Sequence, residues 1–206
     1  NNEFTSARGI EQLIHLEELS FYKNQLTDVD VLGKLPKLRK VNLFGNRLTS
    51  VEGLETASNM RYVVLDKNQL TSVKGLDKLM RLEQLSLGDN QLTSVKSLGA
   101  LERLTRLDLR RNKLSSLDGL ERLKNLKALY VNGNQLTSLD ELKHLTTLTV
   151  LDVSRNQLTS VEELKNLKKL QQLNLYGNPD LSLESVNTLR EALPKCKIEG
   201  VPKELH

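Results

Sequence analysis

Residues 82–104 have the sequence LEQLSLGDNQLTSVKSLGALERL, in which one asparagine, Asn90, divides a set of regularly placed leucines. An asparagine recurs with a fixed 22-residue period in both directions from Asn90. These nine asparagines are Asn2, Asn24, Asn46, Asn68, Asn90, Asn112, Asn134, Asn156 and Asn178. A fixed period of this length is typical of a solenoid, in which each repeat packs only against its neighbours. We therefore expect one elongated domain.

The spacing of apolar residues within this repeat predicts its local structure. Residues 85–87 alternate apolar and polar side chains, which indicates a short strand with one buried face. Val95, Leu98 and Leu101 then follow at intervals of three, which favours a 3₁₀-like connection over an α-helix. Glycines recur seven residues after the asparagine and would ease the turn into that connection. They are Gly9, Gly53, Gly75 and Gly119.

The periodic asparagine stands where the chain leaves the strand and turns into the interior. Such a turn leaves backbone N–H and C=O groups without strand partners, and buried ones must be paired. An asparagine amide both donates and accepts hydrogen bonds. We therefore predict that the ladder from Asn24 to Asn178 is structural and takes no part in catalysis or ligand binding.

The pattern Leu-x-x-Leu-x-Leu-x-x-Asn-x-Leu, which covers residues 2 to about 178, resembles the leucine-rich repeat family. The 22-residue length and the closing Leu-x-x-Leu-x-x-Leu resemble a short subclass. That subclass is typified by the regulatory leucine-rich-repeat subunit of protein phosphatase-1 and by bacterial internalins. The resemblance implies an α/β fold: a right-handed, curved solenoid with a parallel β-sheet on its concave side and 3₁₀ or short helical segments on its convex side.

Both ends of the chain depart from the repeat. Residues 1–178 hold about eight full repeats and a partial first one, which lacks the strand that should precede Asn2. We expect a fragment or processed form of a longer protein, the alternative being a natural start that is frayed. Residues 179–200 predict a C-terminal cap, with a helix that begins after Ser182 and stops before Pro194, and a last strand at residues 196–198. Residues 201–206 have no pattern and are expected to be a tail.

Composition excludes several classes of protein. The 30 basic and 26 acidic residues leave a net charge of only +4, so the surface is mixed rather than basic. No apolar run approaches the roughly 18–20 residues that span a bilayer. Cys196 is the only cysteine, so neither an internal disulfide nor a cysteine metal cluster can form, and we expect a small buried side chain there. One free thiol and no visible signal peptide favour a cytoplasmic protein, with a secreted or bacterial-surface protein left open.

No catalytic constellation is visible in the sequence. The three histidines, His15, His144 and His206, lie in unrelated repeat positions. No glycine-rich phosphate loop, metal-ligand spacing or nucleophile elbow occurs. We therefore predict neither catalysis nor a metal or other cofactor.

Aromatic residues gather at the outward positions of the predicted strands. Each strand has three such positions, at six, four and two residues before the asparagine, which makes 24 over eight strands. They hold Tyr22, Phe44, Tyr62, Tyr130 and Tyr176, and the remaining two aromatics, Phe4 and Phe21, take core leucine positions. Exposed strand positions favour aromatic residues in any case, through cross-strand packing. Gathered on one face, the same side chains also suit a protein-binding surface.

Four apolar residues are expected to adjoin on this face. Tyr22 and Phe44 share one column on neighbouring strands, about 5 Å apart. Tyr62 and Val64 follow on the third strand. We expect Phe44 and Val64 to be exposed, which solubility alone does not explain.

Farther along, the same face becomes charged. Arg106, Asp108 and Arg110 share the fifth strand, with Arg111 beside them and Asp152 two strands on. These charges either pair within the sheet or form a flank that orients a partner. One residue before the asparagine, a column of basic residues is interrupted by glycine and aspartate, which argues against a phosphate-tracking stripe and against nucleic-acid binding. The basic members are Lys23, Lys67, Arg111 and Arg155.

We therefore expect a recognition module that binds another protein or a peptide on its concave sheet. A monomer is favoured, and the oligomeric state is left open. Its predicted anchors are Tyr22, Phe44, Tyr62 and Val64. Its secondary contacts are Arg106, Arg110, Tyr130 and Tyr176. Two alternatives remain open: a regulatory subunit of a protein phosphatase, which the subclass resemblance implies, and the recognition arm of a larger enzyme.

Overall fold

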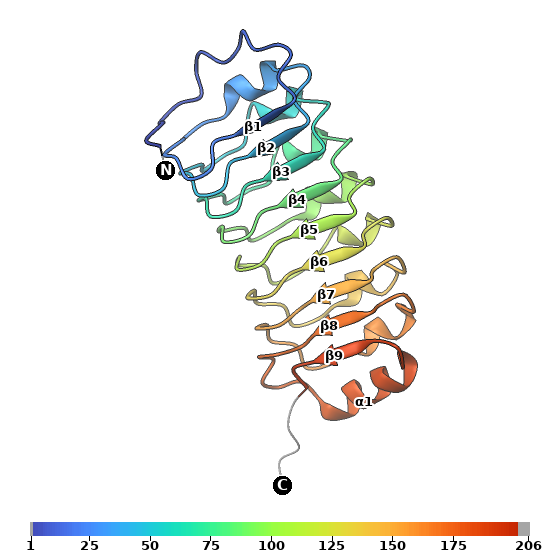
Figure 1. Ribbon diagram of the computed structural model, residues 1–206. Coiled ribbons are helices and arrows are strands. Elements are labelled where there is room, and N and C mark those ends of the chain that lie inside the picture. Colours follow the sequence, from blue (N-terminus) through green and yellow to red (C-terminus); the bar gives the residue numbers. More distant parts are fainter. Residues whose placement is uncertain (1, 202–206) are drawn as a thin grey trace.

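A computed structural model describes residues 2–201 as one open solenoid, with a parallel sheet along one side and short 3₁₀ helices along the other (Figure 1). The sheet has nine strands in sequence order: β1 (Glu18–Ser20), β2 (Lys40–Asn42), β3 (Tyr62–Val64), β4 (Gln84–Ser86), β5 (Arg106–Asp108), β6 (Ala128–Tyr130), β7 (Val150–Asp152), β8 (Gln172–Asn174) and β9 (Lys197–Glu199). Seven 3₁₀ helices lie opposite: η1 (Asp30–Lys34), η2 (Leu54–Thr56), η3 (Leu76–Lys78), η4 (Lys96–Ala100), η5 (Leu120–Arg122), η6 (Asp140–Leu142) and η7 (Glu162–Asn166). One α-helix, α1 (Leu183–Ala192), closes the C-terminal end.

The strands pair in the register that the repeat period sets. Leu85 of β4 pairs with Val63 of β3 and with Leu107 of β5, which hold the same position in the preceding and following repeats. The middle residue of each strand from β2 to β8 faces the interior and is at most 2% exposed. The first and third residues therefore project from the opposite face, which we call the outer face of the sheet.

The core is a stack of leucines that runs the length of the solenoid. Val95, Leu98 and Leu101, spaced by three, are each at most 1% exposed and lie around η4. The 3₁₀ connection predicted from that spacing is confirmed. The helical side is thin because a 3₁₀ turn keeps residues three apart on one face, so each repeat has a single buried stripe there.

The ladder asparagines lie in the turns that follow the strands. The Asn90 Nδ2 group donates to the carbonyl oxygens of Leu65 (3.0 Å) and Leu87 (3.0 Å), and its Oδ1 accepts from the backbone N–H of Leu70 (3.0 Å). Each amide thus joins its own turn to the preceding repeat. Asn46 to Asn178 are only 4–8% exposed, whereas Asn24 is half-buried and makes fewer hydrogen bonds.

The C-terminal segment closes the solenoid with a helix and a strand. Ser182 caps α1, its hydroxyl accepting a hydrogen bond from the Ser185 N–H (3.3 Å). The last strand runs from Lys197 to Glu199, one residue later than predicted, because Ile198 is the residue that pairs with Leu173 and packs against the core. Cys196 is half-buried rather than fully buried, and this burial raises the pKa of its thiol.

At the other end, the first turn carries apolar side chains that the described chain does not cover. Phe4 is 54% exposed, whereas Leu26, one repeat later, is 0% exposed. Leu13 and Ile14 are also about half exposed, at 50% and 51%. Of the predicted tail, residues 202–206 lie outside the described residues. None of the helices in residues 2–201 has the length and apolar character that crossing a bilayer requires.

Candidate functional site

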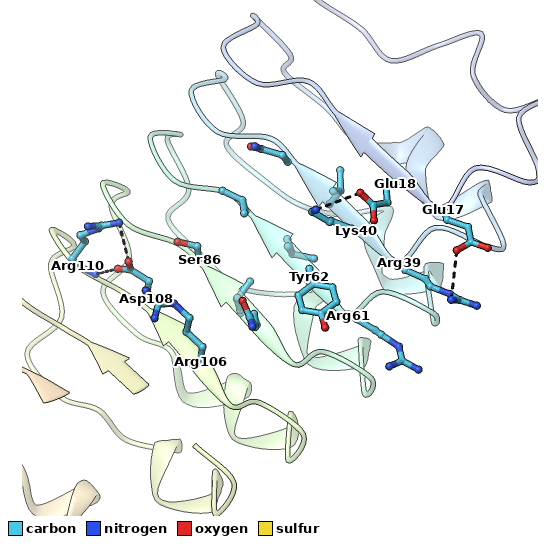
Figure 2. Close-up of a pocket in the computed structure, with 16 residues that line it drawn as sticks. Glu17, Glu18, Arg39, Lys40, Arg61, Tyr62, Ser86, Arg106, Asp108 and Arg110 are labelled. Carbon is cyan, nitrogen blue, oxygen red and sulfur yellow. Dashed lines mark hydrogen bonds and ion pairs between the residues drawn. The ribbon is translucent and has the colours of Figure 1, made fainter. Parts of the chain in front are cut away.

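A groove of about 730 Å³ lies across the outer face of the sheet, from β1 to β5 (Figure 2). Its floor is formed by β2 to β4, from which Tyr62, Val64 and Ser86 project. Its borders are charged: Arg39 and Lys40 lie toward one end, and Arg106 and Arg110 toward the other. The groove therefore combines the apolar surface of Tyr62 and Val64 with polar side chains on its floor and charged side chains at its borders, a mixture that suits a recognition surface.

The charges at the β1–β2 end of the groove are paired within the chain. The Arg39 Nη1 atom lies 3.5 Å from the Glu17 Oε2 atom, and the Lys40 Nζ atom lies 3.3 Å from the Glu18 Oε2 atom. These side chains are 52–69% exposed, so water screens both pairs and each contributes little to stability.

Tyr62 is held in place at the centre of the groove. Its hydroxyl donates to the Glu83 Oε2 atom at 3.0 Å, and the other oxygen of Glu83 lies 2.9 Å from the Arg61 Nη1 atom. The pKa of Tyr62 is raised because the hydrogen bond to Glu83 favours the neutral phenol and because the carboxylate repels a phenolate. The phenol ring therefore has a fixed position and stays uncharged at neutral pH.

We predict that Glu83→Gln lowers the pKa of Tyr62, because a neutral amide neither repels the phenolate nor accepts the hydrogen bond as strongly. A near-ultraviolet absorbance titration of the wild type and the variant measures the shift. Glu102→Gln, which alters an exposed carboxylate on the helical side, is the control and should leave the tyrosine titration unchanged. Identical titration curves for wild type and Glu83→Gln would show that the hydrogen bond does not form in solution.

The four predicted anchors fall into two groups. Tyr62 and Val64 line the groove, whereas Tyr22 and Phe44 lie beside it and stack on each other, with ring centroids 5.0 Å apart and an interplanar angle of 18°. The stack confirms the predicted contact. Phe44 and Val64 are half-buried, so the prediction that they are exposed is wrong. Phe44 lies between the Tyr22 ring and the Lys67 Nζ atom, which is 5.3 Å from its centroid.

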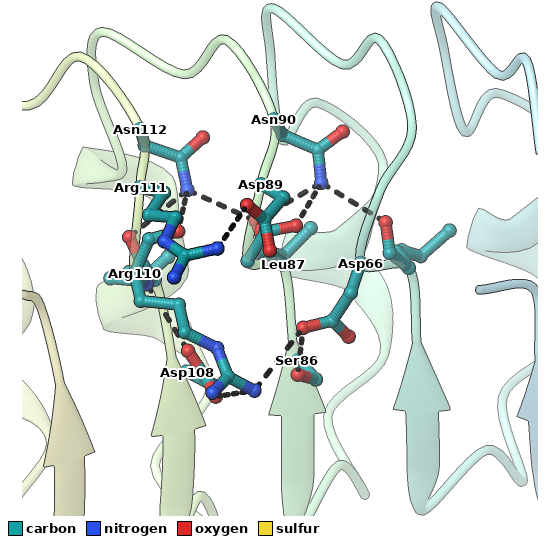
Figure 3. Close-up of polar contacts among 12 residues, drawn as sticks. Asp66, Ser86, Leu87, Asp89, Asn90, Asp108, Arg110, Arg111 and Asn112 are labelled. Carbon is teal, nitrogen blue, oxygen red and sulfur yellow. Dashed lines mark hydrogen bonds and ion pairs between the residues drawn. The ribbon is translucent and has the colours of Figure 1, made fainter. Parts of the chain in front are cut away.

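Two carboxylates at outward positions are buried, against expectation (Figure 3). Asp66 and Asp108 are each 4% exposed, because the long Arg110 side chain extends over Gly88 between them. The Arg110 Nη2 atom lies 2.9 Å from the Asp108 Oδ2 atom and 3.9 Å from the Asp66 Oδ1 atom. Ser86 donates to the same oxygen of Asp66 at 2.8 Å. Burial raises the pKa of Asp108, although the neighbouring Arg110 guanidinium opposes this shift.

The remaining predicted contacts are also engaged within the chain. Arg106 stacks on Tyr130, with its guanidinium carbon 4.4 Å from the ring centroid, and its Nη1 atom donates to the Tyr130 hydroxyl at 2.9 Å. These contacts and those of Arg110 favour the prediction of internal pairing. Tyr176 lies apart, 63% exposed, beside a second hollow of about 490 Å³ that Arg111 and Arg155 also border.

A column of charged residues lies just before the strands, seven residues before each asparagine. It was not predicted, because this position is not one of the three outward positions of the strand. Three of its members, Glu17, Arg39 and Arg61, line the groove, and a fourth, Glu83, pairs with Arg61. Opposite signs at this position in neighbouring repeats were the signal that could have revealed these ion pairs. No group of three or more His, Cys, Asp or Glu residues within 2–201 is placed to hold a metal ion.

The comparisons with known proteins agree with this architecture. A family model described as leucine-rich repeats (2 copies) matches residues 14–56, 102–144 and 146–191. No curated protein matches the sequence. Among solved structures, an internalin of Listeria monocytogenes (InlF) is similar in fold, with a TM-score of 0.84 over 96% of this chain at 22% identity. This chain spans 64% of the length of that internalin.

Two further structures have higher sequence identity. Internalin C2 of Listeria monocytogenes has a TM-score of 0.83 at 30% identity, over 85% of this chain and 77% of its own. The ectodomain of the plant receptor kinase GASSHO1/SCHENGEN3 from Arabidopsis thaliana, solved in complex with Casparian strip integrity factor 2, has a TM-score of 0.74 at 27% identity. That match covers 92% of this chain and 24% of the receptor.

Proposed function

The chain belongs to the leucine-rich repeat family, and from this premise we propose that it is a non-catalytic module that binds another protein or a peptide on the outer face of its sheet. The groove over β1 to β5 carries the proposal, because it combines the partly exposed apolar side chains of Tyr62 and Val64 with charged groups at its borders. The receptor ectodomain of this fold was solved in complex with Casparian strip integrity factor 2, which supports the view that a leucine-rich-repeat solenoid can recognise a partner.

The groove offers two kinds of contact to a partner. Tyr62 and Val64 provide apolar area, and the hydrogen bond from Tyr62 to Glu83 fixes the ring before binding, so less conformational entropy is lost on association. The Tyr22–Phe44 stack extends the apolar surface beside the groove. We assign Arg106, Arg110, Tyr130 and Tyr176 to secondary contacts. The first three are engaged with other side chains in the unbound chain.

The acidic groups of the groove support binding rather than general acid–base chemistry. Glu17, Glu18 and Asp108 each lie within 3.5 Å of a cationic nitrogen of Arg39, Lys40 or Arg110. A general base needs a carboxylate that is free to accept a proton from substrate, and each of these three is already paired with a cation. The phosphatase-regulatory role and the enzyme-arm role stay predictions from the sequence, because no feature of the groove favours either.

Selection of peptides against the folded chain tests the proposal with a partner of any sequence. A displayed library of random peptides is selected on the wild type. The affinities of the recovered peptides are then measured for the double variant Tyr62→Gln/Val64→Asn. The new residues are those that Gln84 and Asn42 already supply at the same positions in neighbouring repeats, so the fold should be retained. We expect at least a tenfold loss of affinity, since two central anchors each contribute about 1 kcal/mol or more.

Met80→Lys provides the matched control. Met80 is an exposed apolar residue, 53% accessible, on the helical side, and Lys124 holds the same repeat position. This variant should bind the selected peptides like the wild type. Phe44→Ala and Tyr62→Ala then apportion the affinity between the stack and the groove. If affinity is unchanged in both single variants and in the double variant, with the fold intact, the outer face is not the binding surface.

A further inference from the structure

The residue before each ladder asparagine has a positive φ in all eight repeats from Asn24 to Asn178. Three of these residues are glycines, with φ of 69–75°. The other five have φ of 50–54°, a conformation that is unfavourable for any residue with a Cβ atom. Four of the five are basic and lie two repeats apart: Lys23, Lys67, Arg111 and Arg155. Basic side chains therefore occupy a position where glycine would be less strained.

The intervening glycines make room for these side chains. A Cβ atom added to Gly45 would lie 3.2 Å from the Lys23 Cγ atom. The same distance separates a Cβ added to Gly133 from the Arg111 Cγ atom. The stems of Lys23, Arg111 and Arg155 thus lie across the glycine of the next repeat, whereas Lys67 is followed by Asp89. We call the four basic residues, at their two-repeat spacing, the basic column.

The column lies among turns that carry a net positive charge. The positions directly before and after the eight asparagines hold six basic residues and one acidic residue, an excess larger than the +4 of the whole chain. The basic members are Lys23, Arg47, Lys67, Arg111, Lys113 and Arg155. Within residues 2–201, Lys23, Lys67 and Arg155 form no ion pair.

The column also borders the aromatic stack. The Lys23 Nζ atom lies 5.2 Å from the centroid of the Tyr22 ring, and the Lys67 Nζ atom lies 5.3 Å from that of Phe44. Both cations therefore lean toward the proposed anchors. A partner that contacts the stack would meet them.

We infer that the basic column binds an extended acidic segment of the partner, with a carboxylate at every third residue in a polyproline II conformation. Adjacent strands lie about 4.8 Å apart, so cations two repeats apart are separated by about 9.6 Å. A polyproline II segment rises about 3.1 Å per residue and repeats its face every three residues, or about 9.3 Å. Carboxylates spaced in this way would meet Lys23, Lys67, Arg111 and Arg155 in turn. The inference rests on the proposed function, whose partner class it names.

One residue interrupts the match. Asp89 stands where the alternation would place a fourth glycine, and its Oδ1 atom lies 3.3 Å from the Arg111 Nη1 atom (Figure 3). It neutralises one cation of the column and would repel an acidic segment. The three-residue repeat of a polyproline II segment matches the two-repeat spacing of the column, so we favour an acidic peptide over a single-stranded nucleic acid.

The test uses labelled synthetic peptides with fluorescence anisotropy, at an ionic strength of about 0.01 M, where charge interactions are least screened. The probe contains four Glu-Pro-Pro units. A peptide with the same composition but paired glutamates tests spacing, a peptide of four Gln-Pro-Pro units tests charge, and oligothymidylate tests nucleic acid. We expect the wild type to bind the Glu-Pro-Pro peptide more tightly than the other three.

Three variants test the residues. Lys67→Gly, which adopts the residue of the intervening repeats, should weaken binding of the Glu-Pro-Pro peptide about threefold, as expected for one exposed ion pair. Lys67→Arg, which keeps the positive charge, should bind the Glu-Pro-Pro peptide as tightly as the wild type does. Asp89→Gly should tighten binding by a similar factor, because it removes a repulsive charge and frees Arg111.

The inference would be overturned if the wild type bound the paired-glutamate peptide or oligothymidylate more tightly than the Glu-Pro-Pro peptide, or if it bound the Gln-Pro-Pro peptide equally well. It would also be overturned if neither Lys67→Gly nor Asp89→Gly changed the affinity for the Glu-Pro-Pro peptide. Its failure is distinct from failure of the proposed function. If library peptides depend on Tyr62 and Val64 but are neither acidic nor sensitive to Lys67→Gly, only the basic column is refuted. If no library peptide depends on Tyr62 and Val64, the proposed function itself fails.

Discussion

Replacing Asn112 by alanine is expected to lower the free energy of unfolding by about 3 to 5 kcal/mol, because several buried backbone groups lose their partners together. The Asn112 Nδ2 group donates to the carbonyl oxygens of Leu87 and Leu109, both at 3.0 Å, and its Oδ1 accepts from the Leu92 N–H at 3.0 Å. The residue is 8% exposed, so water cannot readily replace these bonds. Chemical denaturation followed by circular dichroism measures the loss.

Asn24→Ala is the matched control, since it removes the same side chain from the same repeat position, but near the N-terminal end of the solenoid, where the side chain is more exposed. Asn24 is half-buried, and within residues 2–201 its amide makes two longer hydrogen bonds: its Oδ1 accepts from the Phe4 N–H (3.2 Å), and its Nδ2 donates to the Tyr22 carbonyl (3.3 Å). We expect a loss of about 1 kcal/mol, close to that of an ordinary solvated hydrogen bond. Equal losses at the two sites would contradict the view that buried backbone pairing makes the asparagine necessary.

Gly119→Ala is expected to be the second severe substitution, with a loss of about 4 kcal/mol from backbone strain and overpacking combined. Gly119 has a φ of 95°, which an L side chain rarely adopts. An added Cβ would also overlap the Lys96 carbonyl oxygen and lie 2.8 Å from the Lys96 Cα atom. Both obstacles are backbone atoms of the preceding repeat, so they cannot rotate away. The midpoint of thermal or chemical unfolding reports the effect.

Gly75→Ala separates the two causes. Gly75 has nearly the same φ, 96°, but the atom nearest to an added Cβ is the end of the flexible Glu55 side chain, at 3.3 Å. Only the strain of the positive φ then applies, and we expect a loss of about 2 kcal/mol. A Gly75→Ala loss as large as that of Gly119→Ala would mean that contact between repeats at this turn does not limit side-chain size.

The architecture follows from the sequence because its determinants are periodic. The asparagine that recurs in every repeat, as at Asn90, sets the register in which Leu85 pairs with Leu107. Once both leucines are placed in the core, the alternation along each strand predicts which residues face outward. The contact between Tyr22 and Phe44 follows from that register alone. The 3₁₀ connection follows from the three-residue spacing of Val95, Leu98 and Leu101.

The burial and the contacts of side chains on the outer face do not follow from the repeat period. Alternation says which side chains point outward, but not which of them a longer neighbour will cover. Asp108 is buried because Arg110, two residues later, folds back over it. Arg106 reaches Tyr130 on the next strand by a choice of rotamer that no spacing encodes. The positive φ of Lys23 is equally hidden, since only the glycines of alternate repeats hint at it.

The positions of the repeat therefore fall into two sets. Positions that the period fixes build the scaffold, and asparagine and leucine hold them in nearly every repeat. Positions that vary, such as Tyr62, Val64 and Lys67, decide what the outer face can bind. The stability predictions for Asn112 and Gly119 concern the first set, and the binding predictions concern the second.

Chemical-shift mapping on the isotope-labelled chain, titrated with a peptide selected from the library, tests the central claim most directly. Binding in the groove predicts that the amide signals of Tyr62, Val64 and Ser86 move in proportion to occupancy, and that those of Lys78 and Met80 on the helical side do not. Shifts confined to the helical side, with the signals of the groove unchanged at saturation, would contradict recognition on the outer face of the sheet.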